Sequence, residues 1–319
     1  MTNLHDPRPP VVLIMGPTAS GKTDLALRLA ERWPIQIVSV DSAMVYRGMD
    51  IGTGKPAPEV LQRYPHMLVD ILDPSQPYSA GLFVRDAHKA IATSHAEGKL
   101  PVLVGGTMLY FRALRRGLAD MPSADPQIRA AIDLEATRVG WPAMHAELSR
   151  IDPEAAARIQ PKDAQRIQRA LEVFRLSGRT MTELHALAPN PEERFRFFAY
   201  AWVPSDRQAL YAAIETRLDR MMQSGFRAEV SKLYERGDLH ADLPAIRSVG
   251  YRQLWEHLDG GVPLDSAVKQ AILATRHLAR RQLIWLRSER ELSWIDALDS
   301  SADAQMVRAI ASVLDERQT

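Results

Sequence analysis

A short segment near the start of the chain carries the residue types of a phosphate-binding loop. GPTASGKT, residues 16 to 23, fits the pattern G-x-x-x-x-G-K-[ST] and lies between an apolar run and a segment of helical spacing. Glycines let backbone N–H groups converge on phosphate oxygens, the helix start adds its positive dipole end, and Lys22 adds a point charge. Thr23 adds a hydroxyl that can hold Mg²⁺; the alternative for the segment is a chance glycine-rich turn. The predicted diphosphate-binding residues are Gly16, Pro17, Thr18, Ala19, Ser20, Gly21, Lys22 and Thr23.

A carboxylate stands directly after the next apolar run. IQIVSV ends at Val40, and DSAMVYRGMDIGTGKP, residues 41 to 56, begins with Asp41. An unpaired negative charge beside phosphates is repelled, so its presence needs a reason. Asp41 could accept a proton from an acceptor group, cap the following turn, or hold Mg²⁺ through water. A small-molecule kinase could also place an aspartate here, so Asp41 by itself leaves two chemistries open.

Alternating elements position both groups. Apolar runs at 10–15, 35–40 and 101–106 are typical of buried strands, and a helix is predicted over 80–98. This alternation predicts an α/β fold, a P-loop-containing parallel sheet flanked by helices. After it come Ala-, Arg- and Glu-rich helical stretches without a convincing strand, followed by a strand at 194–203 and helices at 205–224, 226–236 and 264–289. We expect a discontinuous catalytic core, 1–117 and 195–319, and an all-helical insertion domain, 118–194.

Composition narrows the class of protein. The 319 residues are 46% hydrophobic and 25% charged with a net charge of +1, typical of a soluble globular protein and without a global signal for nucleic acid. Zero cysteines exclude disulfides, thiolate catalysis and Cys-ligated zinc. Neither a spanning helix nor a signal peptide is predicted, so we expect a cytoplasmic protein without a membrane partner. A monomer is the simplest expectation.

The phosphate loop alone does not select a reaction. It recognises a di- or triphosphate group, in ATP or another nucleotide or in a diphosphate leaving group. A motor or switch NTPase would need a second strand that ends in a metal-holding aspartate, which HMLVD, residues 66 to 70, could supply. The remaining segments of the chain therefore have to decide.

Six segments occur in a fixed order along the chain: GPTASGKT (16–23), DSAMVYRGMDIGTGKP (41–56), GGTMLYFRAL (105–114), DAQRIQRALEVFRLSG (163–178), IRSVGYRQLW (246–255) and RRQLIWLR (280–287). Together they resemble the tRNA dimethylallyltransferase family, bacterial type, over about residues 10 to 290. The resemblance implies transfer of a dimethylallyl group from dimethylallyl diphosphate to N6 of the adenosine immediately 3′ of the anticodon, with Mg²⁺ as cofactor. Family members often carry Gln at Met44, Ala at Gly54 and Lys at Arg280.

The predicted catalytic residues are Asp41, Thr107 and Lys22. Lys22 would stabilise negative charge on the departing diphosphate, and Asp41 would accept or orient the N6 proton. The resemblance implies that Thr107 contacts the target adenosine or the diphosphate; alternatively, a threonine there caps a helix.

Arginine-rich segments provide the candidate RNA surface, although by charge alone they are more typical of solvated helix faces. Arg166 and Arg169 lie three residues apart, hence on one helical face. Tyr251 and Trp285 stand among arginines, as base stacking requires, while core packing is the alternative for Trp285. Arg129 is implied by the resemblance only, and the insertion is expected to contact the anticodon stem-loop. The predicted tRNA-binding residues are Asp41, Ser42, Ala43, Met44, Thr107, Arg129, Gln165, Arg166, Ile167, Gln168, Arg169, Arg247, Ser248, Val249, Gly250, Tyr251, Arg252, Arg280, Arg281, Gln282, Trp285 and Arg287.

Three functions fit these segments to different degrees. The first is tRNA prenyl transfer, the second a P-loop small-molecule kinase, and the third a nucleotide-gated RNA-binding protein without covalent chemistry. Two basic-aromatic segments and a long helical insertion are superfluous for a small acceptor, which favours the first.

Overall fold

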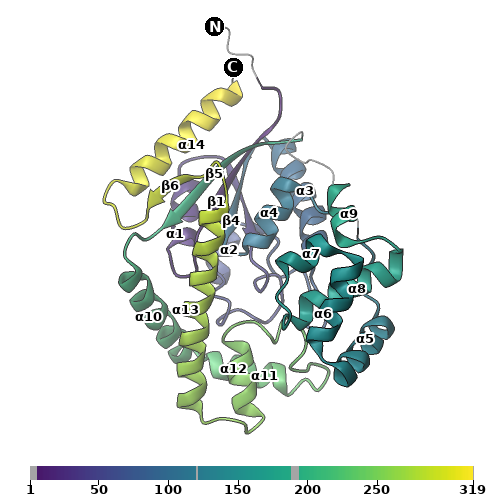
Figure 1. Cartoon of the computed structure of the whole chain (residues 1–319). Helices are drawn as coiled ribbons and strands as arrows, with labels where there is room; N and C mark the ends of the chain where they lie inside the picture. The colour runs from purple at the N-terminus through teal and green to yellow at the C-terminus, as the bar shows by residue number, and fades with distance from the viewer. Residues whose placement is uncertain (1–5, 120, 188–193, 319) are drawn as a thin grey trace. The chain divides into compact units, whose positions relative to one another are not determined.

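The computed structural model describes residues 6–119, 121–187 and 194–318 (Figure 1). Contacts between residues divide the chain into two compact units. The first combines Met1–Arg115 with Glu192–Thr319, and the second is Arg116–Pro191. No helix within the described residues has both the length and the apolar character needed to cross a bilayer.

One six-stranded sheet forms the centre of the first unit, and the predicted parallel sheet is confirmed. Its strand order is β3-β2-β4-β1-β5-β6, and every neighbouring pair is parallel. The strands are β1 Pro10–Met15, β2 Ile35–Val40, β3 His66–Met67, β4 Leu100–Gly105, β5 Arg196–Val203 and β6 Ser293–Asp296.

The central strands β1, β2 and β4 are buried along their whole length, as expected for a parallel sheet covered on both faces. Val12 pairs with Val102 and Ile14 with Val104 in the β1–β4 register. A Cβ on Gly105 would lie 2.0 Å from Val40 O, so glycine is needed where β4 ends against β2. The carboxyl ends of the three strands therefore meet at one edge of the sheet, where open α/β folds bind ligands.

Helices cover both faces of this sheet (Figure 1). On one face, Leu25 and Leu29 of α1 and Met306 and Ile310 of α14 pack with strand residues such as Ile14. The other face is covered by α3, α4 and the α10–α13 group. The helices of this unit are α1 Lys22–Ala30, α2 Pro58–Arg63, α3 Ala80–Ala96, α4 Met108–Arg116, α10 Arg207–Gln223, α11 Phe226–Tyr234, α12 Tyr251–Leu258, α13 Leu264–Ser288 and α14 Ala302–Gln318.

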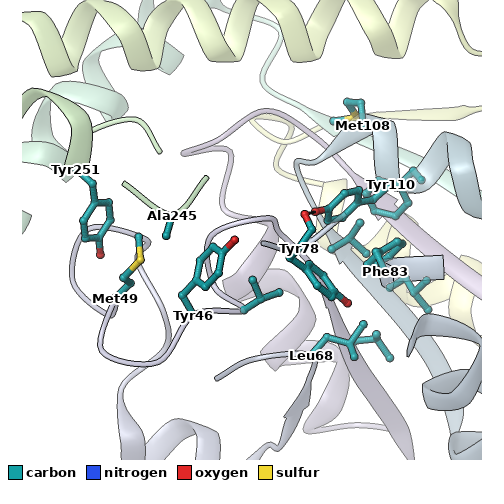
Figure 2. Close-up of a cluster of buried hydrophobic side chains, with 14 of the residues drawn as sticks. Tyr46, Met49, Leu68, Tyr78, Phe83, Met108, Tyr110, Ala245 and Tyr251 are labelled. Atoms are coloured by element: carbon teal, nitrogen blue, oxygen red, sulfur yellow. Dashed lines mark hydrogen bonds between the residues drawn. The ribbon is translucent and has the colours of Figure 1, made fainter. Parts of the chain in front are cut away.

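The segment that follows β2 packs into the hydrophobic core on the face of the sheet that α3, α4 and α10–α13 cover. Figure 2 shows part of this core. Tyr46 and Met49 of this segment are almost fully buried. Nearby, the rings of Phe83 and Tyr110 stack with 4.5 Å between centroids, and Tyr78 meets Tyr110 edge-on at 6.1 Å. Since its apolar side chains are buried, the segment starting at Asp41 is held by packing as well as by hydrogen bonds.

The second unit has a small core of its own, and the described part of it contains helices but no strand. Ile132, Met144, Leu148, Ile167 and Leu171 are buried in that core. Thr180 and Glu183 form a capping box at the last of its helices. These helices are α5 Pro126–Val139, α6 Trp141–Ile151, α7 Pro153–Arg158, α8 Ala164–Ser177 and α9 Met181–Ala186.

Candidate active site

A cavity of about 570 Å³ in the first unit receives loops from the carboxyl ends of β1, β2 and β4. Further walls come from α10, α13 and the segment that leads into α12. The structure thus brings together side chains that lie far apart in the sequence. The predicted site residues that line it are Thr18, Ala19, Lys22, Thr23, Asp41, Ser42, Ala43, Met44, Thr107, Arg247, Ser248, Val249, Gly250, Tyr251, Arg281, Gln282 and Trp285.

The loop of residues 16–23 is fixed from the neighbouring strand. A Cβ on Gly16 would lie 2.2 Å from Trp202 O, and the indole Nε1 of Trp202 donates to Ser20 O at 2.9 Å. Gly21 has φ +80°, a conformation that favours glycine, and immediately precedes α1. Because no side chain caps this helix start, its N–H groups can receive an anion.

Lys22 is a buried cation without a carboxylate partner among the described residues. Its Nζ donates to Pro17 O and to Ser20 Oγ, at 3.3 Å from the latter, and both are neutral acceptors. Burial lowers the pKa of Lys22 to about 7; nearby Arg217 lowers it further and Asp41 opposes the change. A bound anion would relieve this penalty, since it favours the charged form.

Arg217, from α10, is a second cation in the cavity and is absent from the predicted site residues. Its Nη1 donates to Thr18 Oγ1 at 3.3 Å and its Nη2 donates to Thr53 O at 3.0 Å. Burial lowers the pKa of Arg217, while the charges of Asp41 and Asp24 act in the opposite direction. Arginine stays protonated even so, which leaves two positive charges beside the loop of residues 16–23.

The two carboxylate oxygens of Asp41 have different surroundings. Oδ1 accepts from Ala43 N at 2.8 Å and from Met44 N at 3.2 Å, so the turn-capping alternative describes this oxygen. Within the described residues, no donor is bonded to Oδ2. One oxygen of Asp41 therefore fixes the turn, and the other remains available to accept a proton or a hydrogen bond.

Thr107 joins the ends of β2 and β4. Its N–H donates to Val40 O at 3.2 Å, and its Oγ1 accepts from Ser42 N at 3.1 Å. The carbonyl of Thr107 accepts from Tyr110 N at 2.9 Å in the first turn of α4. Because its hydroxyl bonds to Ser42, the threonine links two cavity loops instead of capping the helix through its side chain.

Gln282 is predicted to contact tRNA, but the structure gives it an internal position. Thr18 N donates to its Oε1 at 2.9 Å, and its Nε2 donates to Gly106 O at 2.8 Å. Its side chain therefore spans from the loop of residues 16–23 to the turn before Thr107, and the residue is buried.

The aromatic residues predicted to stack on bases are also differently placed. Tyr251 is 0% exposed; its hydroxyl donates to Glu229 at 2.6 Å and its ring lies edge-on to Phe226 at 5.0 Å. The structure therefore contradicts the prediction that the ring of Tyr251 is open for stacking on a base. α12 begins at this residue, and the ring packs in the core. Trp285 is half-buried and lines the cavity, with the guanidinium of Arg112 5.3 Å from its ring centroid.

The arginines of the first unit that are predicted to contact tRNA are exposed. Arg247 and Arg252 also line a second hollow of about 370 Å³ together with Trp255. Arg280 and Arg287 lie on exposed positions of α13 and do not line the larger cavity. These side chains have the exposure that contact with phosphates requires.

In the second unit, the predicted RNA contacts separate into structural and exposed side chains. Ile167 is 0% exposed, because its position on α8 faces the core. The prediction that its side chain contacts RNA is therefore wrong. Arg129 and Arg169 both bond to the fully buried carboxylate of Glu172, at 2.9 and 2.7 Å. Arg166 keeps 69% of its side chain exposed, Gln165 is exposed, and Gln168 bonds to Asp133.

Residues 66–70 do not supply the second strand that a motor or switch NTPase would need. Only His66–Met67 of the segment 66–70 forms a strand. The carboxylate of Asp70 pairs with Lys55, whose side chain is almost completely buried. Asp70 is therefore committed to a structural ion pair, and no cluster of three metal-ligating His, Cys, Asp or Glu side chains occurs in the described segments.

The chain is similar to known proteins in both sequence and fold. A family model described as IPP transferase matches residues 44–289. The chain is similar to the full-length tRNA isopentenylpyrophosphate transferase of Bacillus halodurans, with 36% identity over 97% of this chain and 98% of that one and a TM-score of 0.70. The tRNA delta(2)-isopentenylpyrophosphate transferase of Staphylococcus epidermidis is 29% identical over 97% and 100% of the two chains, with a TM-score of 0.68. A eukaryotic dimethylallyltransferase acting on tRNA shares the fold: 24% identity, 97% and 80% coverage, TM-score 0.80.

Proposed function

The chain belongs to the IPP transferase family, and from that premise we propose that it prenylates tRNA. The donor is dimethylallyl diphosphate, and the acceptor is N6 of the adenosine immediately 3′ of the anticodon. One observation carries this proposal: a single cavity holds two cations, Lys22 and Arg217, that have no carboxylate partner among the described residues. Beside them lies Asp41, whose carboxylate uses one of its oxygens in hydrogen bonds.

The donor's diphosphate fits the cationic end of the cavity. Backbone N–H groups at the start of α1, Lys22 and Arg217 would hold its oxygens and stabilise the charge that grows as the C–O bond breaks. Thr23 lines the same end of the cavity, and its hydroxyl would hold Mg²⁺ there. When bound, the ion neutralises part of the leaving group's charge.

The acceptor's amine fits the side of the cavity that Asp41 and Thr107 line. N6 forms a bond to the allylic carbon as diphosphate leaves, and the proton on N6 passes to Oδ2 of Asp41. Because the amine becomes acidic only as the new bond forms, an ordinary carboxylate is a sufficient base. The hydrogen bond from Ser42 N orients Thr107 at the same wall.

The exposed arginines supply the contact with the RNA backbone. Arg247, Arg280, Arg281 and Arg287 in the first unit and Arg166 in the second have exposed side chains suited to phosphate contacts. We place the reaction in the cytoplasm and assign it to a monomer; light scattering of the purified protein with and without tRNA tests the latter.

The test is a direct assay for the product. Purified protein, Mg²⁺, labelled dimethylallyl diphosphate and unmodified tRNA are incubated, and the tRNA is digested to nucleosides. Label on N6-dimethylallyladenosine supports the proposal. Transfer of a γ-phosphate from ATP to a small acceptor, with unlabelled tRNA, would replace it with the kinase alternative.

A further inference from the structure

The segment from Asp50 to Lys55 carries none of the residues assigned to the chemistry above, yet one half-buried carboxylate binds its backbone. Glu229, from α11, accepts from Asp50 N at 2.9 Å, Ile51 N at 2.7 Å and Gly52 N at 3.1 Å. Tyr251 adds a fourth donor, its hydroxyl at 2.6 Å. Three hydrogen bonds from the segment to one carboxylate, which Tyr251 holds through the fourth, fix the path of the segment more firmly than packing alone.

Neighbouring contacts hold the same segment from its other sides. A Cβ on Gly52 would lie 2.0 Å from Phe226 Cε2, so the backbone approaches the ring as closely as glycine permits. Thr53 Oγ1 donates to Met49 O at 2.7 Å, and Lys55 Nζ donates to Tyr46 O at 2.6 Å.

The segment has one hydrogen bond that leads into the cavity. Thr53 O accepts from Arg217 Nη2 at 3.0 Å, and the other described bond of this guanidinium is to Thr18 Oγ1 at 3.3 Å. Gly54 leaves room for the group, because a Cβ there would lie 2.2 Å from Nη2. The position of Arg217 therefore depends on where the carbonyl of Thr53 points.

We propose that Glu229 is a positioning residue for the anion site. By holding the N–H groups of residues 50–52, it aims the carbonyl of Thr53, which in turn sets the guanidinium of Arg217 toward the diphosphate. The inference rests on the proposed function in one respect, namely that the anion is the donor's diphosphate. Glu229 does not line the cavity, so it acts through Arg217 and touches no substrate.

A double-mutant cycle on the full-length protein tests this coupling. We expect Glu229→Gln to raise both the Kd for inorganic pyrophosphate and the KM for dimethylallyl diphosphate about tenfold, because an amide places a donor against backbone donors. kcat should fall as well, because Arg217 also stabilises the departing diphosphate, whereas tRNA affinity should stay near the wild-type value. Arg217→Met should raise the same constants about 10- to 100-fold, and Glu229→Gln should add nothing in that background.

The cycle overturns the proposal if the two substitutions multiply, or if Glu229→Gln lowers the melting temperature and kcat while pyrophosphate binding stays normal. Tyr251→Phe serves as a milder variant that removes one of the four bonds and keeps the other three. It should raise the pyrophosphate Kd about twofold to threefold, again only when Arg217 is present. An unchanged Kd in Tyr251→Phe counts against the proposal.

The two proposals fail in different ways. If wild-type protein binds pyrophosphate but does not prenylate tRNA, the proposed function is wrong, while the pyrophosphate cycle still measures the coupling of Glu229 to Arg217. If tRNA is prenylated and the cycle is additive in free energy, only the role of Glu229 is wrong.

Discussion

The cations of the cavity and those of the helical insertion have opposite kinds of partners. Within the part of the chain that the structure describes, Lys22 and Arg217 donate only to carbonyl and hydroxyl oxygens. In the insertion, by contrast, Arg129 and Arg169 share the buried carboxylate of Glu172. Burial is the largest influence on the pKa of Glu172 and raises it, but hydrogen bonds from the two arginines bring the pKa below its usual value.

This difference in partners distinguishes cations that can bind a ligand from cations that stabilise the fold. An enclosed cation without a counterion destabilises the fold, so its presence indicates an anion that arrives later. A cation bonded to a buried carboxylate stabilises the fold and has less charge to offer. Arg175 is also bonded to a carboxylate, the partly exposed one of Glu135, and these hydrogen bonds raise the pKa of Arg175 above its usual value.

The largest effect on turnover is expected at Asp41, whose carboxylate lies near Lys22 and Arg217 in the cavity. Asp41→Asn keeps an oxygen for the N–H groups of Ala43 and Met44 but cannot accept the N6 proton. We expect kcat to fall about 10²- to 10⁴-fold with tRNA affinity unchanged, measured by single-turnover prenylation and filter binding. An unchanged rate would remove Asp41 from the mechanism.

Replacing an unmatched cation should weaken the donor site and stabilise the free protein. We expect Lys22→Met to raise the KM for dimethylallyl diphosphate about 10²-fold, because a buried charge-assisted contact is lost. The melting temperature of the ligand-free protein should rise, since a desolvated cation is removed. Lys22→Met with normal donor kinetics would contradict the assignment of the loop.

The same lysine should make pyrophosphate binding depend on pH. Burial lowers the pKa of Lys22 to about 7 from 10.5, and a bound anion raises it again, so binding takes up a proton above pH 7. We expect the affinity of the Mg²⁺-free protein for pyrophosphate to fall as pH rises through 7, by calorimetry. Without ligand, the unfolded chain holds this proton between about pH 7 and 10.5, so stability rises with pH in that window. Lys22→Met should lack both dependences.

Removing the charge of Glu172 in the insertion should destabilise the protein, whereas Lys22→Met should stabilise it. Glu172→Gln leaves Arg129 and Arg169 without their shared counterion, and we expect a loss of about 2–3 kcal/mol. Hydrogen exchange of peptides from α5 and α8 reports this loss locally. Pyrophosphate binding should remain at the wild-type value; a change there would mean that the contrast between the two regions does not hold.

The smallest effect is expected at an exposed arginine of the insertion. Arg166→Ala should weaken tRNA binding a few-fold and reduce the salt slope by about 1, because one phosphate contact is lost. Arg158, also exposed and paired with Glu154 at 2.7 Å, offers a matched control outside the predicted RNA contacts. Equal salt slopes in Arg166→Ala and Arg158→Ala would return Arg166 to an ordinary solvated face.

The central sheet is predictable because its strands are continuous apolar runs. β1 and β2 have the predicted bounds, and β4 is shifted by one residue from the predicted 101–106. β6 carries no such run: of its four residues only Ile295 is buried, so alternation and apolarity give no signal. α12 and α14 are also missing from the prediction, the first because its aromatic and basic residues favour RNA contact over a helix that packs in the core.

The site residues also fall into two groups, those that local sequence patterns predict and those that they miss. Local patterns find the loop around Lys22 and the carboxylate of Asp41, since each follows its own strand. Arg217 is missed because its partners, Thr18 and Thr53, lie far away in the sequence. A signal does exist: Arg217 sits beside Leu218 and three residues after Ile214, on the buried stripe of α10, where a charged residue is unusual.

The strand order has a consequence for how such a protein can diversify. The chain leaves the sheet after β4 and returns as β5, and these two strands lie on either side of β1. No rung of the β1 ladder depends on what the intervening helices contain. Evolution can therefore lengthen, shorten or exchange the helices between β4 and β5, while the residues at the ends of the central strands are inherited unchanged.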